Sequence, residues 1–571
     1  MRLVVAALGV SSVVAQLTLL RELLAAFGGN ELALGVFLGH WLLLTGLGTA
    51  LGRRAQGGPR GEGHLVAGQM LIAVAPMAGM ILLRAMRDAV LVRGAAAGIV
   101  TAGLCSVVVL APFCLVSGYL LTLAVALMDR AEGVRGLGTV YVADSAGSVA
   151  GGVLFTYVLT HWLDHFGVLW SVAWLPLLLA AVGAAFWRRW AALAVCGALA
   201  CGWMFLGISG VDRWSTRLQF PGQEVVFVGN SAYGRVVVTR VEGQLNLSQN
   251  GVASLLTADR ARLEETVLCA LSQRPEARDV LLLGGLVTGS GRFLLEQGVE
   301  HVTGVELDPL AIEAGRRFEP RNLESPALEV LTADGRRYLR ETTNRYDLVI
   351  VDTGAPVTSQ LNRLYTFEFF QEVKRVLRPG GVVAFGLGQY QNVISTELAQ
   401  VLAVGRQTVG AVFGHVMMLP LGRVFFLASD GELHTDIADR LQKRGRPVQW
   451  MKPSYLGTML SPNRLADIDR AVAEPVALNT DFHPVLYFYH LRHWLSQFPR
   501  VPTVVLAMAA LAIAVYVWRI GAIPRAVLAS GLAASALEVV LLLGVQVACG
   551  SLYKQLGVVV AVFMAGLAFG G

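Results

Sequence analysis

Ten long apolar runs occupy the two ends of the chain, and a stretch rich in charged residues separates them. A run of about 20 apolar residues is long enough, as an α-helix, to cross about 30 Å of hydrocarbon. Seven runs precede the charged stretch, near residues 3–27, 31–52, 64–86, 96–127, 138–161, 166–186 and 190–209. Three follow it, near 501–519, 524–548 and 551–571. The pattern predicts a multi-pass α-helical membrane protein with two helical blocks, residues 1–210 and 499–571.

The charged stretch between these blocks has the pattern of a globular α/β domain. Short strand-like runs alternate with amphipathic, helix-like segments, which is typical of a parallel sheet covered by helices. We therefore expect a globular domain over about 211–498, inserted between the membrane blocks.

Composition supports this division and narrows the function classes. The 571 residues are 55% hydrophobic and 15% charged, which excludes an entirely soluble protein. The formal charge of +6 is a small excess that more often orients membrane helices than binds nucleic acid. The expected partner is thus a lipid membrane and not a nucleic acid. The six cysteines form no CxxC motif and indicate neither a disulfide framework nor a zinc site.

The two ends of the chain resemble each other at a constant offset of 522 residues. Gly28 matches Gly550, Leu19-Leu20 matches Leu541-Leu542, and Gln16 falls on Glu538. A repeated helical hairpin is a common building unit of membrane domains. The repeat argues that the first run is a membrane helix and not a cleaved signal peptide. Because the N-terminal copy continues into Arg53-Arg54, we expect the chain to be truncated at Gly571.

Arginine placement leaves the membrane side of the inserted domain open. With the N-terminus in the cytoplasm, nine loop arginines would be cytoplasmic: Arg53, Arg54, Arg60, Arg130, Arg135, Arg188, Arg189, Arg519 and Arg525. Only Arg84, Arg87 and Arg93 would lie outside. Seven crossings would then put the domain outside, whereas a domain that uses a cytosolic nucleotide should lie inside.

A glycine-rich turn marks a candidate nucleotide site in the domain. The strand-like run 279–283 leads into a turn that contains Gly284, Gly285, Gly289 and Gly291, and a helix-like segment follows. A strand, a glycine turn and a helix let a nucleotide approach the backbone closely. The next strand ends at Glu306, where one carboxylate can accept both ribose hydroxyls.

Two further carboxylates follow strands of the same domain. Asp334 comes after the strand 328–331, and Asp352 ends the strand 346–351. Since ligands of open α/β sheets bind at the carboxyl ends of the strands, we expect Glu306, Asp334 and Asp352 to face one crevice. Asp334 is placed to accept a hydrogen bond from an adenine amine. Glu306 has a competing structural explanation as a solvated acid before Asp308-Pro309, which can cap the next helix.

The order of these motifs resembles the class I methyltransferase fold and, more narrowly, spermidine synthase and the other polyamine aminopropyltransferases. Residues 233–238 and 245–251 resemble the small β-rich domain of that family, which implies a β-rich subdomain over 211–275 before a Rossmann-like domain over 276–498. Residues 352–356 resemble its gatekeeping loop, and 364–381 the helix and turn that follow it. Residues 479–481 and the flanking helices resemble membrane-embedded bacterial members, which implies the bacterial inner membrane as the location.

The resemblance implies transfer of an aminopropyl group from decarboxylated S-adenosylmethionine to an amine such as putrescine. Asp352 and Tyr365 would be catalytic, and Tyr233 would join Asp352 in binding the amine. Glu306 would hold the ribose, Asp334 the adenine, and the glycine turn the nucleoside. The family implies no metal, because the sulfonium is already a good leaving group, and it commonly forms homodimers.

Four positions depart from the family pattern where it places polar groups. In this chain, Val287 occupies the position of an acid in the family's glycine turn, and Ala355 that of the second acid of the gatekeeping loop. Leu263 occupies the position of a tyrosine, and Gly229 that of a glutamine. Each lost group would have met the cationic amine. Three alternatives therefore stay open: a methyltransferase-like enzyme that uses S-adenosylmethionine itself, a polyamine-like transporter with a nucleoside-sensing domain, and a silent binding domain.

Four charged residues fall within apolar helices, namely Arg21, Glu22, Asp144 and Glu538. An unpaired charge is costly in a membrane, so such residues tend to be paired or to line a polar path. They could form a path for a cationic amine, or simply pair locally or reach the interface. Gly147, Gly151 and Gly152, near Asp144, are expected to allow close helix packing.

Overall fold

The structure is a computed structural model of the 571-residue chain. It describes residues 1–28, 30–55, 61–90, 97–132, 136–205, 208–257, 259–390, 393–474, 476–499, 503–550 and 552–570. Arg60, Arg93, Arg135 and Gly571, on which expectations were placed, lie outside these ranges.

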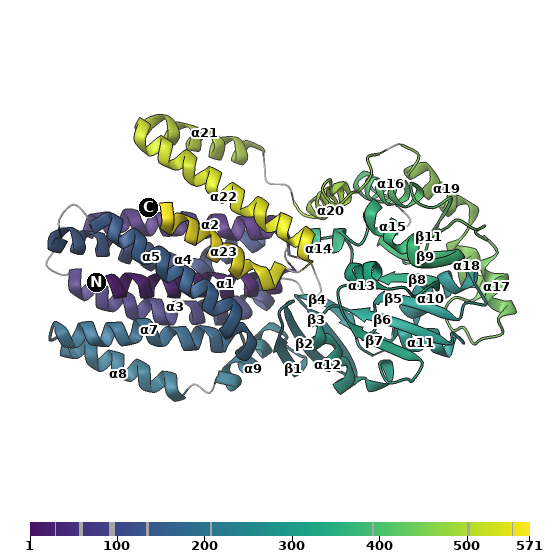
Figure 1. Cartoon of the computed structure of the whole chain (residues 1–571), viewed down its shortest axis with the longest axis horizontal. Helices are drawn as coiled ribbons and strands as arrows, with labels where there is room; N and C mark the ends of the chain where they lie inside the picture. Colours follow the sequence, from purple (N-terminus) through teal and green to yellow (C-terminus); the bar gives the residue numbers. More distant parts are fainter. Residues whose placement is uncertain are drawn as a thin grey trace.

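The apolar helices form a bundle at one end of the molecule, and the α/β domain lies at the other (Figure 1). Before the domain come α1 (Arg2–Phe27), α2 (Glu31–Ala55), α3 (Gly61–Val90), α4 (Ile99–Glu132), α5 (Gly136–Leu154), a π-helical turn (Phe155–Leu159), α6 (Thr160–Trp162), α7 (His165–Phe186), α8 (Trp190–Phe205) and α9 (Ile208–Gln219). After it come α21 (Thr503–Arg519), α22 (Ala522–Cys549) and α23 (Leu552–Gly570). Both ends of the chain lie at the end of the bundle that faces away from the domain.

Seven helices in the described part of the chain are long and apolar enough to cross a membrane. They span Arg2–Phe27, Glu31–Arg54, Gly61–Val90, Ile99–Asp129, Gly138–Trp162, His165–Phe186 and Ala522–Gln546. The run predicted at 190–209 is shorter than expected, because α8 ends at Phe205 and the chain bends by 80° into the polar helix α9. Arg189 lies 3.9 Å from Glu62, so the 187–190 turn and the start of α3 share the end of the bundle opposite the domain.

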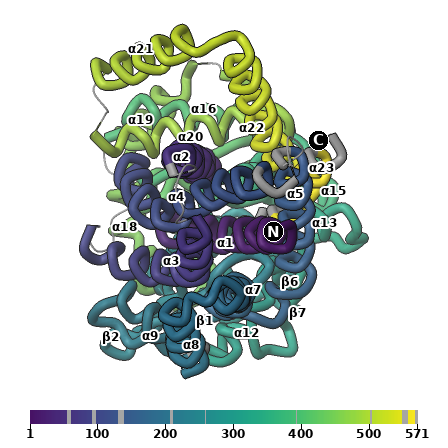
Figure 2. Tube along the Cα trace, turned by 90° about the vertical axis from the view of Figure 1, so that its left-hand side faces the viewer, coloured from purple at the N-terminus to yellow at the C-terminus, as the bar shows by residue number. Residues whose placement is uncertain are grey.

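Helix α1 is the centre of the bundle, with α3, α5 and α7 around it (Figure 2). Its contact with α5 is close because small residues face each other. A Cβ atom on Gly147 would overlap the carbonyl oxygen of Ala6, and one on Gly151 would lie 2.9 Å from the carbonyl oxygen of Val10. The expected packing role of these glycines is confirmed.

The matching hairpins at the two chain ends share one detail of backbone geometry. Gly28 after α1 and Gly550 after α22 both adopt the left-handed conformation, with φ of 57° and 71°. Each donates its N–H to the carbonyl four residues earlier, which terminates the helix as a glycine C-cap. These are the two glycines that the 522-residue offset aligns.

The α/β part contains two sheets. The first is antiparallel in the order β1 (Glu224–Asn230), β2 (Arg235–Val241), β3 (Gln244–Gln249) and β4 (Val252–Leu255). The second has seven strands in the order β10 (His415–Pro420), β11 (Arg423–Ser429), β9 (Leu377–Gln389), β8 (Tyr346–Asp352), β5 (Asp279–Gly284), β6 (His301–Glu306) and β7 (Leu328–Thr332). Strands β9, β8, β5, β6 and β7 are parallel, and the β10–β11 hairpin is antiparallel. This mixed sheet, preceded by the small sheet and flanked by apolar helices, confirms the predicted architecture.

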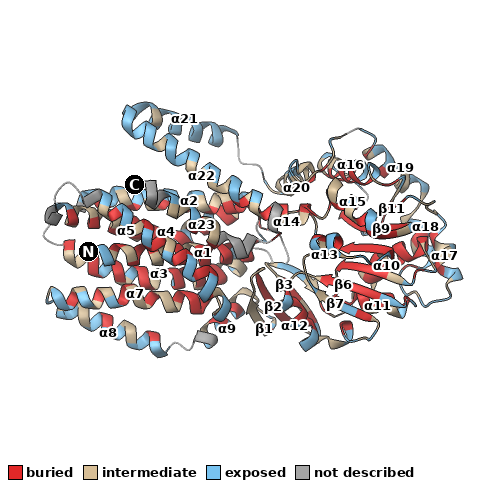
Figure 3. Ribbon diagram, viewed as in Figure 1, coloured by how far each residue is buried: buried red, intermediate tan, exposed pale blue. Residues whose placement is uncertain are grey.

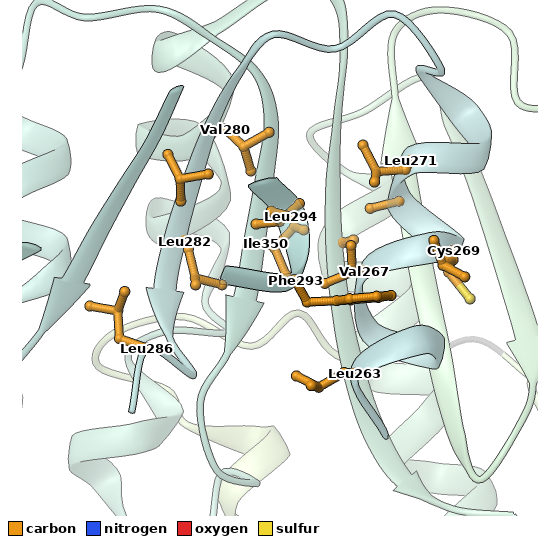
Figure 4. Close-up of a cluster of buried hydrophobic side chains, with 14 of the residues drawn as sticks. Leu263, Val267, Cys269, Leu271, Val280, Leu282, Leu286, Phe293, Leu294 and Ile350 are labelled. Carbon is orange, nitrogen blue, oxygen red and sulfur yellow. The ribbon is translucent and has the colours of Figure 1, made fainter. Parts of the chain in front are cut away.

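Helices cover both faces of the seven-stranded sheet, and further helices pack around them. The helices of the domain are α10 (Arg260–Gln273), α11 (Ser290–Glu296), α12 (Pro309–Phe318), α13 (Gly335–Glu341), α14 (Ser359–Asn362), α15 (Phe367–Val376), α16 (Thr396–Gly410), α17 (Ile437–Lys443), α18 (Pro453–Met459), α19 (Pro462–Ala471) and α20 (Val485–Ser496). In β5, Val280 and Leu282 face α10 and α11 (Figure 4), whereas Leu281 and Leu283 pack into the core of the opposite face. The strand is buried on both faces, which explains its uninterrupted apolar sequence.

Burial follows this layered arrangement, as Figure 3 shows. Red, buried residues fill the seven-stranded sheet and α1, whereas α21 and most of α22 expose apolar side chains. In Ala522–Gln546, only 6% of the apolar window is buried in the protein. These two helices therefore present surfaces suited to lipid.

One predicted turn lies inside a strand. Residues 378–381, expected as a turn before the fifth strand, belong to β9. The register jumps from Tyr346 opposite Leu377 to Leu348 opposite Val382, so these four residues leave the ladder as a bulge. Gly380 has a φ of 68°, which glycine adopts without steric strain, and it therefore accommodates the bulge.

Candidate active site

The glycine turn has the backbone geometry that its sequence predicts. Gly284, Gly285 and Gly289 have φ of 76°, 69° and 94°, in the left-handed region that favours glycine. A Cβ atom on Gly285 would overlap the carboxylate of Asp352. Gly291 serves packing instead, because a Cβ there would lie 3.0 Å from a methyl group of Leu328. The turn thus brings backbone and the Asp352 side chain together at the end of β5.

Asp352 ends β8 and is held by groups from three other elements. Arg262 of α10 donates to one carboxylate oxygen at 2.7 Å, and Ser290 donates to the other at 2.9 Å. Arg423 of β11 lies 3.5 Å from the first oxygen. The carboxylate is completely buried, whereas the Arg262 side chain is one-third exposed. An amine that reached Asp352 would therefore compete with Arg262 for it.

Tyr365 supports the loop that follows Asp352. Its hydroxyl donates to the carbonyl oxygen of Gly354 at 3.1 Å and lies 3.2 Å from the hydroxyl of Thr353. The ring is 1% exposed and packs edge-on against Phe385, and burial raises the pKa of the hydroxyl. The structure places Tyr365 at the base of the loop, beside Asp352.

Glu306 ends β6 next to a second acid. Its carboxylate accepts from the backbone N–H of Leu307 at 3.1 Å. Burial raises the pKa of Glu306 to about 7, and the nearby carboxylates of Asp308 and Asp352 add to the shift. Asp308 caps α12 as predicted, by accepting from the N–H of Leu310 at 3.0 Å. The structure confirms the capping role of Asp308, and it shows Glu306 as a half-buried acid and not a freely solvated one.

Asp334 caps α13 and lines a cavity of about 740 Å³. Its carboxylate accepts from the N–H of Arg337 at 3.0 Å and forms an ion pair with Arg363. Tyr233 lines the same cavity, and burial raises its pKa, with Asp308 and Asp334 adding to the effect. Asp334 and Tyr233 therefore share one cavity, whose described lining does not include Glu306 or Asp352.

A buried ionic cluster joins the membrane bundle to the β-rich subdomain. The Glu22 carboxylate of α1 accepts from Arg84 of α3 at 2.9 Å, from Arg235 of β2 at 2.7 Å and from His165 of α7 at 2.8 Å. Asp212 of α9 accepts from Arg84 at 2.8 Å. All these side chains are less than 7% exposed. Glu22 thus connects two other membrane helices to the domain.

A second polar junction lies near the loop that follows Asp352. The Glu31 carboxylate of α2 accepts from the backbone N–H of Ser359 at 2.7 Å. Burial and the nearby Glu31 carboxylate together raise the pKa of Tyr487 of α20. Gly550 packs against Arg363 and Asp334. The α22–α23 hairpin therefore borders the site directly.

Of the other membrane charges, Arg21 adjoins Glu22 on α1, whereas Asp144 and Glu538 lie at other levels of the bundle. The guanidinium of Arg21 lies 4.8 Å from the ring centre of Phe155. Asp144 packs beside Gly9 of α1, thirteen residues before Glu22, which is about 20 Å along a helix axis. Glu538 precedes Gln546 by two helical turns. The structure does not bring Asp144 into the Glu22 cluster.

Three arginines of the site could not be identified from the sequence. Arg262, Arg363 and Arg423 pair with Asp352 or Asp334 from α10, the end of α14 and β11. A glutamine of the site was missed as well, namely Gln249 of β3, which donates to Asp308 at 3.2 Å. Each reaches the strand ends through tertiary packing, and no local motif marks it.

Comparison with known proteins identifies a family that part of the domain resembles. Residues 263–420 match the family described as spermine/spermidine synthase domain. Polyamine aminopropyltransferase 1 of Streptomyces coelicolor is 29% identical over 299 residues, covering 47% of this chain and 55% of that protein. The polyamine aminopropyltransferase of Mycobacterium tuberculosis is 35% identical over 181 residues, covering 30% and 34%. The chain thus spans between a third and just over half of these relatives.

One solved structure with a detectable likeness is a spermidine synthase in complex with the transition state analogue AdoDATO. It aligns with 44% of this chain and 88% of its own, at 20% identity and a TM-score of 0.38. The predicted resemblance to the spermidine synthase family is confirmed over the segment that the family match covers.

Proposed function

Because residues 263–420 match the family described as spermine/spermidine synthase domain, we propose that this chain transfers an aminopropyl group from decarboxylated S-adenosylmethionine to an amine such as putrescine. The observation that carries the proposal is the strand-end geometry. Glu306 and Asp352 end parallel strands on either side of β5, and the glycine turn follows β5 itself. The location we propose is the bacterial inner membrane, on the strength of the apolar helices.

In this proposal, each strand-end group has one task. Glu306 holds the ribose hydroxyls, Asp334 the adenine amine, and the glycine turn lies against the nucleoside. The amine nitrogen forms a bond to the propyl carbon, the C–S bond breaks, and its electron pair stays on sulfur as neutral methylthioadenosine. Asp352 orients the amine and accepts its proton after the amine displaces Arg262 from the carboxylate. Tyr365 fixes the loop and thereby positions Asp352.

A second candidate function is supported by the arginines around Asp352. Arg262 and Arg423 are each about one-third exposed, and Val287 is apolar where the family pattern has an acid. Two guanidinium groups suit a carboxylate better than a cationic aminopropyl tail. S-adenosylmethionine carries that carboxylate, so methyl transfer, with S-adenosylhomocysteine as the product, is the alternative.

The test uses the full-length protein in lipid nanodiscs. Decarboxylated S-adenosylmethionine and S-adenosylmethionine are each supplied with putrescine, and both methylthioadenosine and S-adenosylhomocysteine are measured. We expect methylthioadenosine from the decarboxylated donor, lost in Asp352→Asn and kept in Asp430→Asn, a surface control on the same domain.

Three other outcomes would replace this proposal. S-adenosylhomocysteine formation that Arg262→Gln abolishes would favour methyl transfer. Nucleoside binding without turnover would favour a silent binding domain. No binding of either nucleoside would refute both enzymatic proposals and return attention to transport through Asp144 and Glu538.

A further inference from the structure

Helix α14 lies between the candidate active site and the membrane bundle. Figure 1 shows it where the end of α22 reaches the domain, and it packs against both α22 and α20. The loop 353–358 joins it to Asp352, and Arg363, the ion-pair partner of Asp334, directly follows its last residue. A shift of α14 would therefore move groups on two sides of the site.

A membrane residue holds the start of this helix. The N–H of Ser359, the first residue of α14, donates to the Glu31 carboxylate at 2.7 Å. Because the first N–H groups of a helix have no acceptor within it, a bond from another element fixes where such a helix begins. Ser359 and Glu31 are 5% and 7% exposed, so water competes little for this bond. Glu31 is itself fixed as the first residue of α2, whose start Asn30 caps by accepting from the N–H of Ala33 at 3.1 Å.

The loop before α14 is held at both of its ends. At its start, groups of the domain hold Asp352, and Tyr365 donates to the carbonyl oxygen of Gly354. At its end, the bond to Ser359 comes from the membrane bundle. Loss of the Glu31 acceptor would therefore free the end of the loop while its start stays in place. A misplacement of about 1 Å in an active site can lower its rate about 10²-fold.

A glycine of the membrane bundle lies against the other end of α14. Gly550 lies between α22 and α23, and a Cβ atom there would overlap the guanidinium of Arg363 and lie 2.9 Å from a carboxylate oxygen of Asp334. The Arg363 side chain is only 7% exposed, so it has little room to move aside. Gly550 therefore lets the backbone of the hairpin lie directly on the Asp334–Arg363 ion pair.

The equivalent glycine at the other end of the chain has no such neighbour. Gly28 ends α1 with the same left-handed geometry, and a Cβ atom there meets nothing within 4 Å. An alanine would strain the backbone at both positions, whereas it would meet the site only from position 550. The pair Gly28 and Gly550 thus separates backbone strain from contact with Arg363.

We propose that the membrane bundle positions the active site through α14, with Glu31 holding the end of the Asp352 loop and Gly550 keeping Arg363 on Asp334. Both are positioning residues, since each acts through another residue of the site. The proposal rests on the proposed function, in which Asp352 orients the amine and Asp334 holds the adenine. It gives the two contacts different tasks, because Glu31 governs turnover and Gly550 governs nucleoside binding.

The test of Glu31 uses the full-length protein in phosphatidylcholine nanodiscs, with kcat counted per methylthioadenosine site found by calorimetry. Glu31→Ala should lower kcat for methylthioadenosine formation about 10–10²-fold and leave the methylthioadenosine Kd within about threefold. Glu31→Gln keeps a carbonyl oxygen for the N–H of Ser359 and should restore kcat to within about threefold. The control is Thr49→Val, farther along α2, where the hydroxyl bonds to the carbonyl of Thr45.

Hydrogen exchange, followed by mass spectrometry, reports on the loop without turnover. Exchange over residues 353–359 should be faster in Glu31→Ala than in the unmodified protein and unchanged in Thr49→Val. Calorimetry tests the second contact: Gly550→Ala should weaken methylthioadenosine binding about tenfold, because the displaced guanidinium moves Asp334, and Gly28→Ala should change it less than about twofold. The Glu31 variants keep the proposal falsifiable if Gly550→Ala does not fold.

Three results would overturn the proposal. They are unchanged kcat and exchange in Glu31→Ala, a loss of kcat in Glu31→Gln as large as in Glu31→Ala, and equal nucleoside affinities of Gly550→Ala and Gly28→Ala. A failure of the proposed function looks different, since the unmodified protein would then bind methylthioadenosine but transfer no aminopropyl group. In that case, faster exchange in Glu31→Ala together with the difference between the two glycine variants would still support positioning through α14.

Discussion

The ionic cluster around Glu22 allows a quantitative prediction about how the domain is held on the membrane bundle. Glu22 and Asp212 balance Arg84 and Arg235, and all four side chains are nearly inaccessible to water. Glu22→Gln keeps the shape of the side chain but removes its negative charge. The buried guanidinium groups of Arg84 and Arg235 must then share the carboxylate of Asp212. The glutamine NH₂ group would also face donors and not acceptors.

The cost follows from the burial of the partners. Removing one member of a buried ion pair typically destabilises a protein by about 3–5 kcal/mol, because the other charge stays desolvated. That is about 10²–10⁴-fold in the equilibrium constant. Glu224→Gln is the matched control, because its pair with Arg240 lies on the same subdomain with both side chains about half exposed or more. We expect it to cost at most about 1 kcal/mol.

Pulse proteolysis in urea, with the full-length protein in detergent micelles, measures the free energies of unfolding of Glu22→Gln and Glu224→Gln. The double variant Glu22→Gln/Arg235→Gln should cost less than the sum of the two single variants, because it removes one charge of each sign. A Glu22→Gln variant within 1 kcal/mol of the unmodified protein, or strict additivity in the double variant, would contradict this account of the cluster.

Three predictions concern the site itself. Because the pKa of Glu306 is about 7 and its ionised form accepts the ribose hydroxyls, methylthioadenosine binding measured by calorimetry should weaken about tenfold from pH 8 to pH 6, and Glu306→Gln should bind weakly with no such dependence. A flat pH profile in the unmodified protein would exclude this role. Asp352→Asn should lower kcat about 10²–10⁴-fold in a turnover assay while nucleoside binding changes little, and full activity would remove Asp352 from the mechanism. Gly285→Ala and Gly445→Ala should each cost about 1–2 kcal/mol in thermal unfolding, because both residues have φ between 60° and 70°. Only Gly285→Ala should abolish activity, since its methyl group meets Asp352 whereas Gly445 faces open space; equal activities would show that the turn tolerates a side chain.

Features set by local sequence could be predicted, and features set by tertiary contact could not. The turn at Gly284–Gly291 and the acids Glu306 and Asp352 follow their strands directly, so strand ends and site residues appear together in the sequence. Arg262 meets Asp352 across 90 residues, and Arg235 meets Glu22 across 213. Hydropathy detected the run at 190–209 but could not reveal the 80° bend after Phe205, since a bend leaves the apolar composition unchanged.

Because the membrane bundle and the α/β domain share buried contacts, segments that are separate along the chain do not correspond to independent structural units. A fragment of residues 211–498 would keep Arg235 but lose Glu22, and it would lose Glu31, which accepts from the N–H of Ser359. It would also lack Thr156, Tyr157, Val545, Val558 and Val559, the membrane residues that line the Asp334 cavity. Such a fragment would present a nucleoside site without its membrane side, so ligand affinities measured on it would not describe the site of the full-length protein.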